Sequence, residues 1–595
     1  MKKATFLITI LLLIACNQKK GNSADAVTED NKELATLLEN YYNQRMHLFP
    51  LEATINGDTL YNNLLPADFT DSYRHKLRDF YTRYKDSISK YNEDELNDND
   101  RKSYAIFKYQ METELKGLSM IGNSYFPFDQ FTGVPITLGQ MGSGMSYQPF
   151  KTVKDYDNWL ERASAFATWS DSAIVNFKKG LAINYVLPKA IVVKMIPQME
   201  AMVTKDATNS LFYGPIKSMP ATFSESDRKR LTTAYIDLIN KKIIPSYKKL
   251  GDFLKNEYLP KARTTTGVNA LAGGKEYYDY SVKYWTTTNK TPQEIYNTGL
   301  SEVKRIKAIM ERIKDSVGFK GDLNAFFSYM KTDKRFMPYK TPKEVLDAFR
   351  KIETTMEPNL KKMFTLVPKS KFEIRQTEAF RAASASAEYN PGLPDGSRPG
   401  IFYVPIVDAT KFNTTSGMES LFLHEAIPGH HYQLSLQMEN EKLPKFRRFI
   451  WYGAYGEGYA LYCESLGKEL GLYTDPYQHM GALGDEMHRA VRLVVDVAMH
   501  TGKMTREQAI KYMMDNEAIS EDGATAEIER YMAYPGQALS YKTGALKIRE
   551  LREKYSKELG PKFSISAFHA EFLKDGCMPL EIIEKSMDSW AKSQK

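Results

Sequence analysis

Helical periodicity over long stretches constrains this chain more than any other feature of its sequence. Apolar side chains recur every three or four residues, opposite charged faces, over residues 32–48, 73–91, 153–183, 226–256 and 292–315. Two Thr-Pro pairs, at 291–292 and 341–342, are each followed by a glutamate two residues later, the pattern of a capped helix start. The sequence therefore predicts a mainly α fold.

Strand signals are few, and the clearest is Gly-Ile-Phe-Tyr-Val at residues 400–404. A turn sequence rich in proline and glycine, at 394–399, leads into it. The strand ends twenty residues before His424, the first of three histidines that lie close together in the sequence. We expect a small β-sheet beside the helix that carries these histidines, and a deep cleft between two helical halves.

The first sixteen residues have the order of a lipoprotein signal. Lys2 and Lys3 precede an apolar run, 4–15, that is short for a membrane span and ends in a sequence that resembles a bacterial lipobox. We expect Cys16 to be lipidated and to become the first residue of the mature protein; the alternative is an uncleaved anchor helix. The expected location is the cell envelope, at the outer membrane, facing the periplasm or the exterior.

The sequence divides into four expected parts. Residues 1–16 are the signal, and 17–30 are a polar tether that lacks core-forming side chains. Residues 31–290 are a helical N-terminal part. Residues 291–595 are a C-terminal part that holds the chemistry.

Charge and cysteine content exclude several classes of function. The net charge of +8 is modest for 595 residues, and no basic cluster is interleaved with aromatic residues, so we expect no nucleic-acid partner. Only Cys463 and Cys577 follow Cys16, which excludes a disulfide framework and a cysteine metal site. Hydrophobic residues make up 42% of the chain, enough to build a packed core.

The segment His-Glu-Ala-Ile-Pro-Gly-His-His at 424–431 carries the strongest chemical signal. A catalytic zinc ion commonly takes three ligands from His, Glu or Asp, with a further carboxylate nearby to accept a proton from water. In the familiar helical pattern the second histidine follows the first by four residues, and a glutamate follows the first directly. Here Pro428 stands where that second histidine would fall.

Two histidines are therefore alternatives for the second ligand. On an unbroken helix His430 would be rotated by roughly 120° from His424, and His431 would lie about 10 Å farther along the axis. Pro428 cannot donate a hydrogen bond, and Gly429 adopts backbone angles that other residues avoid, so a break there would bring His430 or His431 into place. We favour His430 and leave His431 open.

A third ligand is expected from a following helix. Glu457 lies 27 residues after His430, which leaves room for a turn and a return helix. Its neighbours Gly456 and Gly458 would let that helix approach the metal closely. Glu464, seven residues on, falls on the same face and is expected to orient a histidine. The competing interpretation is a structural cluster of histidines.

These residues resemble a family of bacterial proteins, commonly lipoproteins, known as domain of unknown function 885. The matching stretches are FPLEAT at 49–54, PDGSRPGIFYV at 394–404, HEAIPGHHYQ at 424–433, GEGYALYCE at 456–464, RLVVDVAMHTGKMTREQAIKYM at 492–513 and RYMAYPGQALSYKTG at 530–544. The resemblance covers nearly the whole mature chain. Tyr459 replaces the family's usual tryptophan, a conservative change for a packing residue.

That family is similar to the gluzincin metallopeptidases, so the resemblance implies a zincin-like fold and one Zn²⁺ per chain. It makes His424, His430 and Glu457 the metal ligands. It makes Glu425 the general base, which takes a proton from the metal-activated water and delivers it to the leaving amine.

Further residues are expected to contact the substrate. The segment 531–541 is rich in hydrogen-bond donors for a developing oxyanion; we nominate Tyr534 and Tyr541 as catalytic, with Gln537 nearby and His500 as a more distant alternative. For each tyrosine, packing with an exposed hydroxyl is the competing interpretation.

Arginines are candidates for binding the carboxylate of a peptide. Arg398 precedes strand 400–404, which we expect to bind extended peptide as an edge strand; a turn arginine in solvent is the alternative. Arg489 and Arg492 are further candidates, although Arg492 could equally pair with Asp496 one helical turn on.

The resulting hypothesis is a zinc-dependent peptidase that hydrolyses oligopeptides or polypeptide termini, tethered to the membrane through Cys16. Two alternatives remain. One is a non-catalytic envelope lipoprotein that binds peptides. The other is a zinc hydrolase of a non-peptide amide or ester.

Overall fold

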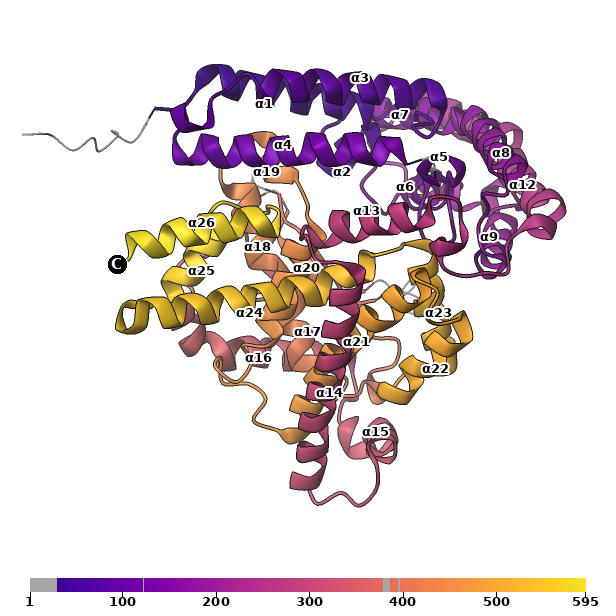
Figure 1. The fold of residues 1–595 in the computed structure, drawn as a ribbon. Helices are drawn as coiled ribbons and strands as arrows, with labels where there is room; N and C mark the ends of the chain where they lie inside the picture. Colours follow the sequence, from indigo (N-terminus) through magenta and orange to yellow (C-terminus); the bar gives the residue numbers. More distant parts are fainter. Residues whose placement is uncertain (1–28, 121, 378–381, 383–385, 394–395, 397) are drawn as a thin grey trace, which may run out of the picture.

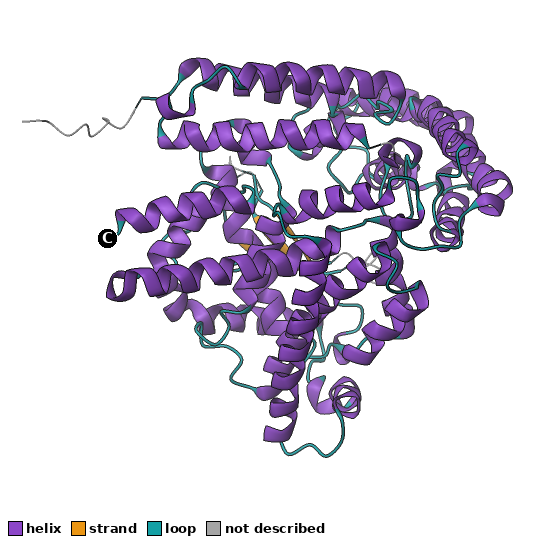
Figure 2. Ribbon diagram, viewed as in Figure 1, coloured by secondary structure: helices purple, strands orange, loops and turns teal. Residues whose placement is uncertain are grey.

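The computed structural model describes residues 29–120, 122–377, 382, 386–393, 396 and 398–595. The expected signal, most of the tether and the lipidation of Cys16 lie outside these residues. Within the described part of the chain, no helix combines the length and apolar character that a bilayer span requires. The protein is mainly helical, as predicted, with one small sheet among the described residues (Figures 1 and 2).

The regular elements of the N-terminal half are helices where the chain is described, apart from an isolated β-bridge between Pro188 and Arg263. Its α-helices are α1 (Lys32–Leu48), α2 (Pro50–Ile55), α3 (Asp71–Ile88), α4 (Asp98–Ser119), α5 (Gly122–Tyr125), α6 (Val134–Gly142), α7 (Val153–Ser164), α8 (Phe166–Ala182), α9 (Lys189–Ala201), α10 (Gly214–Lys217), α11 (Glu225–Leu238), α12 (Ile244–Phe253) and α13 (Gly274–Thr286). The predicted helix 226–256 contains a π-helical turn, Ile239–Ile243, because Pro245 has no N–H with which to continue the α-helical pattern. The predicted helix 153–183 divides at Ala165.

The C-terminal half contains the remaining helices and the sheet. The helices are α14 (Pro292–Ser316), α15 (Leu323–Thr332), α16 (Pro342–Met363), α17 (Met418–Glu425), α18 (His430–Glu439), α19 (Lys445–Phe449), α20 (Gly453–Glu464), α21 (Pro476–His500), α22 (Arg506–Asn516), α23 (Glu521–Ala533), α24 (Ser540–Leu559), α25 (Ile565–Lys574) and α26 (Leu580–Ser593). Both Thr-Pro pairs start helices as predicted, since Thr291 and Thr341 accept N-cap hydrogen bonds from Glu294 and Glu344.

Two long helix pairs form the frame of this half. α14 runs along α21, and α20 runs along α24 (Figure 1). The second pair is unusually close: a Cβ atom added at Gly544 would lie 1.8 Å from the carbonyl oxygen of Ala454, and one at Gly458 would lie 2.5 Å from the Cα of Gly544. Glycine is required at both positions, and this packing holds α20 in place.

The largest buried cluster joins both ends of the chain. It includes Leu34 and Phe107 of the first helices together with Phe422, Tyr459 and Met587 of the C-terminal half. The division at residue 290 therefore does not separate two independent cores, and its exact position stays a prediction.

The sheet consists of β1 (Phe372–Gln376), β2 (Glu388–Asn390) and β3 (Gly400–Val404), in the order β1-β3-β2. The predicted strand 400–404 is confirmed as β3, and it lies beside α17, where the ring of Phe402 packs against Phe422. The expectation of an edge strand is wrong. β3 pairs in parallel with β1 and antiparallel with β2, so both of its edges are occupied and a peptide has no free backbone to pair with there.

Candidate metal centre

A break in the motif helix places the histidines. α17 ends at Glu425 and α18 begins at His430, and both Ala426 (φ −101°, ψ −110°) and Gly429 (φ −68°, ψ −124°) leave the helical region between them. A Cβ atom at Gly429 would lie only 1.9 Å from the carbonyl oxygen of His424, so only glycine fits this reversal. The Pro-Gly pair thus ends one helix and starts another.

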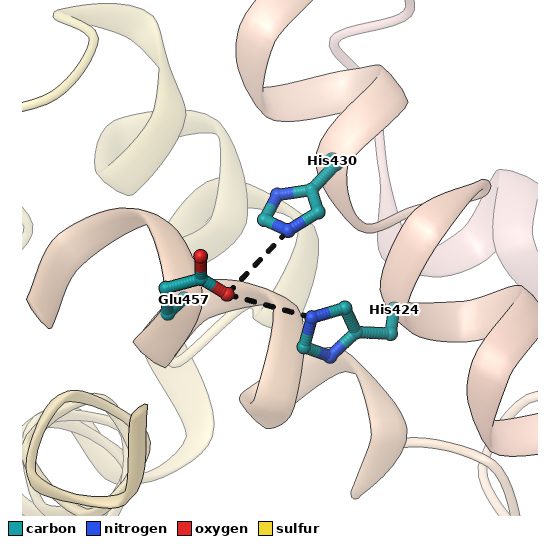
Figure 3. A group of neighbouring side chains, drawn as sticks. All are labelled: His424, His430 and Glu457. Atoms are coloured by element: carbon teal, nitrogen blue, oxygen red, sulfur yellow. Dashed lines mark ion pairs between the residues drawn. The ribbon is translucent and has the colours of Figure 1, made fainter. Parts of the chain in front are cut away.

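The break brings His430 to face His424, with ring centroids 5.0 Å apart, and α20 carries Glu457 to both. The Oε2 atom of Glu457 lies 3.6 Å from Nε2 of His424 and 3.7 Å from Nε2 of His430 (Figure 3). One ligand atom from each of the three side chains lies within 4.8 Å of the others. Residues that are 33 positions apart in the chain therefore converge on one point.

Glu464 fixes the orientation of His424 through Nδ1, the ring nitrogen that does not face Glu457. Its Oε1 atom lies 2.7 Å from Nδ1 of His424, and both side chains are buried. A hydrogen on Nδ1 donated to this carboxylate leaves Nε2 free to face Glu457. Glu464 thus has the orienting position that its spacing from Glu457 predicts.

The electrostatics of the group favour a cation at its centre. Burial lowers the pKa of His424, but the carboxylates of Glu457 and Glu464 outweigh burial and raise that pKa to about 10. Burial likewise raises the pKa of Glu457, yet the rings of His424 and His430 hold it far below its usual range. Two carboxylates around two imidazoles therefore stabilise positive charge at this point.

The donor set fits a zinc ion. Two imidazole nitrogens and one carboxylate oxygen are a common catalytic ligand set, and bonds of about 2.0–2.2 Å would place tetrahedral ligand atoms roughly 3.3–3.6 Å apart. The observed separations of 3.6 and 3.7 Å are close to this range. All three ligand atoms lie within 4.8 Å of one another, so the side chains would move closer together as they bind the ion.

Comparison with known proteins identifies the family. The family described as "Bacterial protein of unknown function (DUF885)" matches residues 50–587. The chain belongs to this family. A candidate lipoprotein from Colwellia psychrerythraea is 26% identical, with a TM-score of 0.85 over 94% of this chain and 99% of that one.

A candidate lipoprotein of unknown function from Shewanella oneidensis shares the fold, with 20% identity and a TM-score of 0.73 over 93% of this chain and 99% of that one. No curated protein matches the sequence. The family resemblance inferred from the sequence is therefore confirmed.

His431, the alternative second ligand, faces away from the group in this family member. Its Nδ1 atom lies 2.9 Å from the hydroxyl oxygen of Tyr389 on β2, and its ring packs 5.0 Å from that of Phe372 on β1. Burial lowers the pKa of His431 to about 4. His431 therefore connects α18 to the sheet, and His430 is the histidine that joins His424.

The nominated catalytic residues lie at different places around the group. Glu425 ends α17, directly after His424, and is half-buried. Tyr541 lies in the first turn of α24, where the centre of its ring is 4.8 Å from the guanidinium of Arg492. Tyr534 follows α23, and its ring contacts Trp285. Among the described residues, no hydrogen bond joins either tyrosine hydroxyl to a member of the metal group, so their catalytic roles stay predictions.

Three expected substrate contacts are already engaged elsewhere. His500 accepts a hydrogen bond at Nδ1 from the backbone of Val268 and donates from Nε2 to the carbonyl of Tyr531, so neither ring nitrogen is free, and the expectation for His500 is wrong. Gln537 accepts a hydrogen bond from Arg530. Arg398 is exposed and donates to the carbonyl of Pro391, which matches the turn alternative.

Arg492 of α21 does not form the ion pair with Asp496 that the sequence offered as an alternative. Arg492 binds the carboxylate of Glu527 at 3.0 Å and the hydroxyl of Tyr531 at 2.9 Å, instead of Asp496. Arg489 pairs with Asp485 at 3.6 Å. The partners of Arg492 come from α23 and could not be inferred from spacing along α21, whereas Asp485 lies on α21 itself.

Two aromatic residues near the site, Trp451 and Tyr459, have contacts that the sequence did not predict. Trp451 lies 6.0 Å from the ring of His430 and covers Gly456, whose Cβ atom would lie 2.1 Å from the indole, so Gly456 makes room for Trp451 and not for a metal. Tyr459 donates a hydrogen bond to the carbonyl of Pro428 at 3.0 Å and ties α20 to the helix break. The one hint of this contact in the sequence is the hydroxyl group, which Tyr459 has and the family's usual tryptophan lacks.

Proposed function

We propose that this protein is a zinc-dependent peptidase that hydrolyses oligopeptides or the termini of polypeptides. The observation that carries the proposal is the convergence of His424, His430 and Glu457 directly beside the carboxylate-bearing residue Glu425. A cluster of histidines with only a structural role does not need a carboxylate such as Glu457 within 4 Å of both imidazoles. Nor does it need a second carboxylate such as Glu464 bound to the other nitrogen of His424.

The roles of the residues follow from their positions. His424, His430 and Glu457 would hold one zinc ion, which when bound polarises the scissile carbonyl and makes water acidic. Glu464 keeps the proton on Nδ1 of His424 and so presents Nε2 to the ion. Glu425 accepts a proton from the attacking water and passes it to the amine of the leaving fragment.

We further propose that the protein is a lipoprotein of the cell envelope. Cys16 at the end of its apolar run supplies the attachment point. The Colwellia and Shewanella proteins that share its fold are described as candidate lipoproteins, which supports this placement. The peptide substrates would then be extracytoplasmic.

The test compares wild-type protein that begins at Ala24 with Glu425→Gln, and with Glu441→Gln as a control at an exposed glutamate. Zinc content is measured by atomic emission, and cleavage of a mixed peptide library by mass spectrometry. We expect about one zinc per chain in all three proteins, and cleavage by all except Glu425→Gln. The cut positions then reveal whether the enzyme works from a peptide end.

Other outcomes separate the alternatives. Absence of zinc under conditions that load a control metalloenzyme would refute the metal centre and favour a peptide-binding lipoprotein. Zinc without cleavage of any peptide would refute the peptidase and point to another amide or ester.

A further inference from the structure

Two adjoining cavities lie between the N-terminal helices and the C-terminal half, the first of them against the segment that enters α20. The first has a volume of about 340 Å³ and lies between α1, α4, α13 and residues 446–453. The second, of about 300 Å³, lies between α4, α13 and the end of α23. Glu114, Tyr284 and Trp285 line both, so the two cavities share one wall.

The side chain of Glu114 is the feature that needs explanation. It projects from α4, and among the described residues it accepts no hydrogen bond and forms no ion pair. Burial raises the pKa of this carboxyl group, and Arg45 only partly offsets the effect. The residue is half-buried and lines both cavities, so a cation that enters either cavity can reach its carboxyl group.

The neighbouring charges do not supply that partner. Arg45 lines the first cavity, but Glu52 binds its guanidinium through two hydrogen bonds of 3.1 and 2.8 Å, and Tyr81 takes a third. Arg74 lines the second cavity and donates to the carbonyls of Leu118 and Met120. Arg45 is paired with Glu52, so no cation of the first cavity's lining forms an ion pair with Glu114 among the described residues.

Aromatic rings and hydrogen-bond acceptors surround this charge. Tyr109, Tyr284 and Trp285 line the first cavity together with Glu114. Four polar atoms of the lining are buried without a hydrogen-bond partner in the described structure: the hydroxyls of Tyr41, Tyr109 and Tyr452 and the Oε1 of Gln110. A carboxylate among aromatic rings and amide oxygens is the environment in which proteins bind ammonium and guanidinium groups.

Trp451 lies between the first cavity and the metal centre. Trp451 and Gly453 line the first cavity; Trp451 contacts the ring of His430, and Gly453 starts the helix turn that ends at Glu457. Tyr534 lines the second cavity, with its ring 5.0 Å from Trp285. Tyr284 is 40% exposed, so a ligand can enter from solvent.

We propose that these cavities form a specificity subsite for a cationic group of the peptide substrate, either its free α-ammonium or the side chain of a lysine or arginine, with Glu114 as the counter-ion. The subsite rests on the proposed peptidase function, and it gives that function a substrate class: peptides with a positive charge near the scissile bond. Tyr109, Tyr284 and Trp285 would surround the cation while the chain extends toward His430.

The test uses matched pairs of hexapeptides that differ by one charge. One pair has the same sequence with a free or an acetylated amino terminus. In the other pairs the terminus is acetylated and a lysine or its neutral analogue norleucine occupies each position in turn. Binding to Glu425→Gln protein is followed by the fluorescence of Trp285 and Trp451, and kcat/KM is measured with catalytically intact protein.

We expect the cationic member of at least one pair to bind about tenfold more tightly, the effect of about one charge-assisted contact. Glu114→Gln should reduce that preference below about twofold while it leaves zinc content and binding of neutral peptides unchanged. Glu112→Gln, at an exposed position of the same helix, should keep the preference. Preference within the first pair identifies the α-ammonium, and preference within a lysine pair identifies a side chain.

Tyr284→Leu provides a second variant, because this exposed ring can be removed without disturbing the core, and it should weaken the preference severalfold. Equal binding of both members in every pair, or a preference that survives Glu114→Gln, would overturn the subsite. The two proposals fail separately: hydrolysis without charge preference refutes the subsite, and charge-selective binding without hydrolysis refutes the peptidase.

Discussion

Removal of Glu464 should weaken zinc binding without removing any ligand. Glu464 accepts a hydrogen bond of 2.7 Å from Nδ1 of His424 in a buried setting. Hydrogen bonds that involve a charged partner contribute about 1.5–3 kcal/mol, and each 1.4 kcal/mol is a factor of ten in affinity. We therefore expect zinc affinity to fall by about 10- to 100-fold, the range seen for carboxylates that orient metal-binding histidines.

Two substitutions of Glu464 separate the contribution of its charge from that of its hydrogen bond. Glu464→Gln keeps an oxygen that can accept the hydrogen bond and loses only the charge, so the affinity should fall about tenfold. Glu464→Ala also frees the ring of His424, and the loss should approach 100-fold. Glu469→Gln, at an exposed position five residues on, is the matched control.

The assay is competition for zinc against a fluorescent chelator at constant pH, with the free energy of unfolding measured in parallel. An affinity for Glu464→Ala within twofold of wild type would refute the orienting role. If wild-type protein itself fails to take zinc from the chelator, the metal centre is refuted instead, so the two failures are distinct.

Three further predictions concern the scaffold. Gly544→Ala would place a methyl group 1.8 Å from the carbonyl of Ala454 and force α20 and α24 apart, so the unfolding free energy should fall by about 3 kcal/mol or more in urea titrations; a change below 1 kcal/mol would contradict the packing. Tyr459→Phe removes the buried hydrogen bond to Pro428 and should cost about 1–2 kcal/mol by the same measurement, whereas no loss would show that this bond is dispensable. Burial raises the pKa of Asp496 to about 7, against the lowering effect of hydrogen bonds from Tyr278 and Gly536. Because the folded state then holds this proton more tightly than the unfolded chain, stability should fall as pH rises from about 4 to 7, and Asp496→Asn should flatten that decline by about 1.4 kcal/mol for each pKa unit; parallel pH profiles of the two proteins would contradict this.

Local patterns predicted the helical content well, because helix periodicity and N-caps depend on neighbours within four residues. α1 and α14 start at the predicted residues, 32 and 292, and β3 occupies the predicted strand. The position of β3 within the sheet was not predictable in this way. Its two partners pair with it from residues 372–376 and 388–390, and nothing in the strand itself shows whether one or both of its edges are covered.

In the candidate metal group, too, local sequence predicts some features and leaves others to the tertiary structure. The sequence predicts the helix break between His424 and His430. Pro428 has no N–H to donate a hydrogen bond, and only glycine at position 429 fits beside the carbonyl of His424. Glu457 and Glu464 are seven residues apart, which on a helix places both carboxylates on one face, so the sequence also predicts the return helix. Sequence alone left His430 and His431 as alternatives, and only the packing of His431 against the sheet separates them.

The sequence by itself determined the helical class, the family, the interruption of the motif helix and the residue types that converge on it, because each of these depends on order and spacing along a few turns of chain. The tertiary structure decided which side chains are already engaged and which remain free. His500 is bonded at both ring nitrogens by backbone groups of distant segments, whereas Glu114, on the wall between two cavities, has no hydrogen bond or ion pair among the described residues. Contacts of this kind join residues that are far apart in sequence, and their energies depend on burial that no local pattern records.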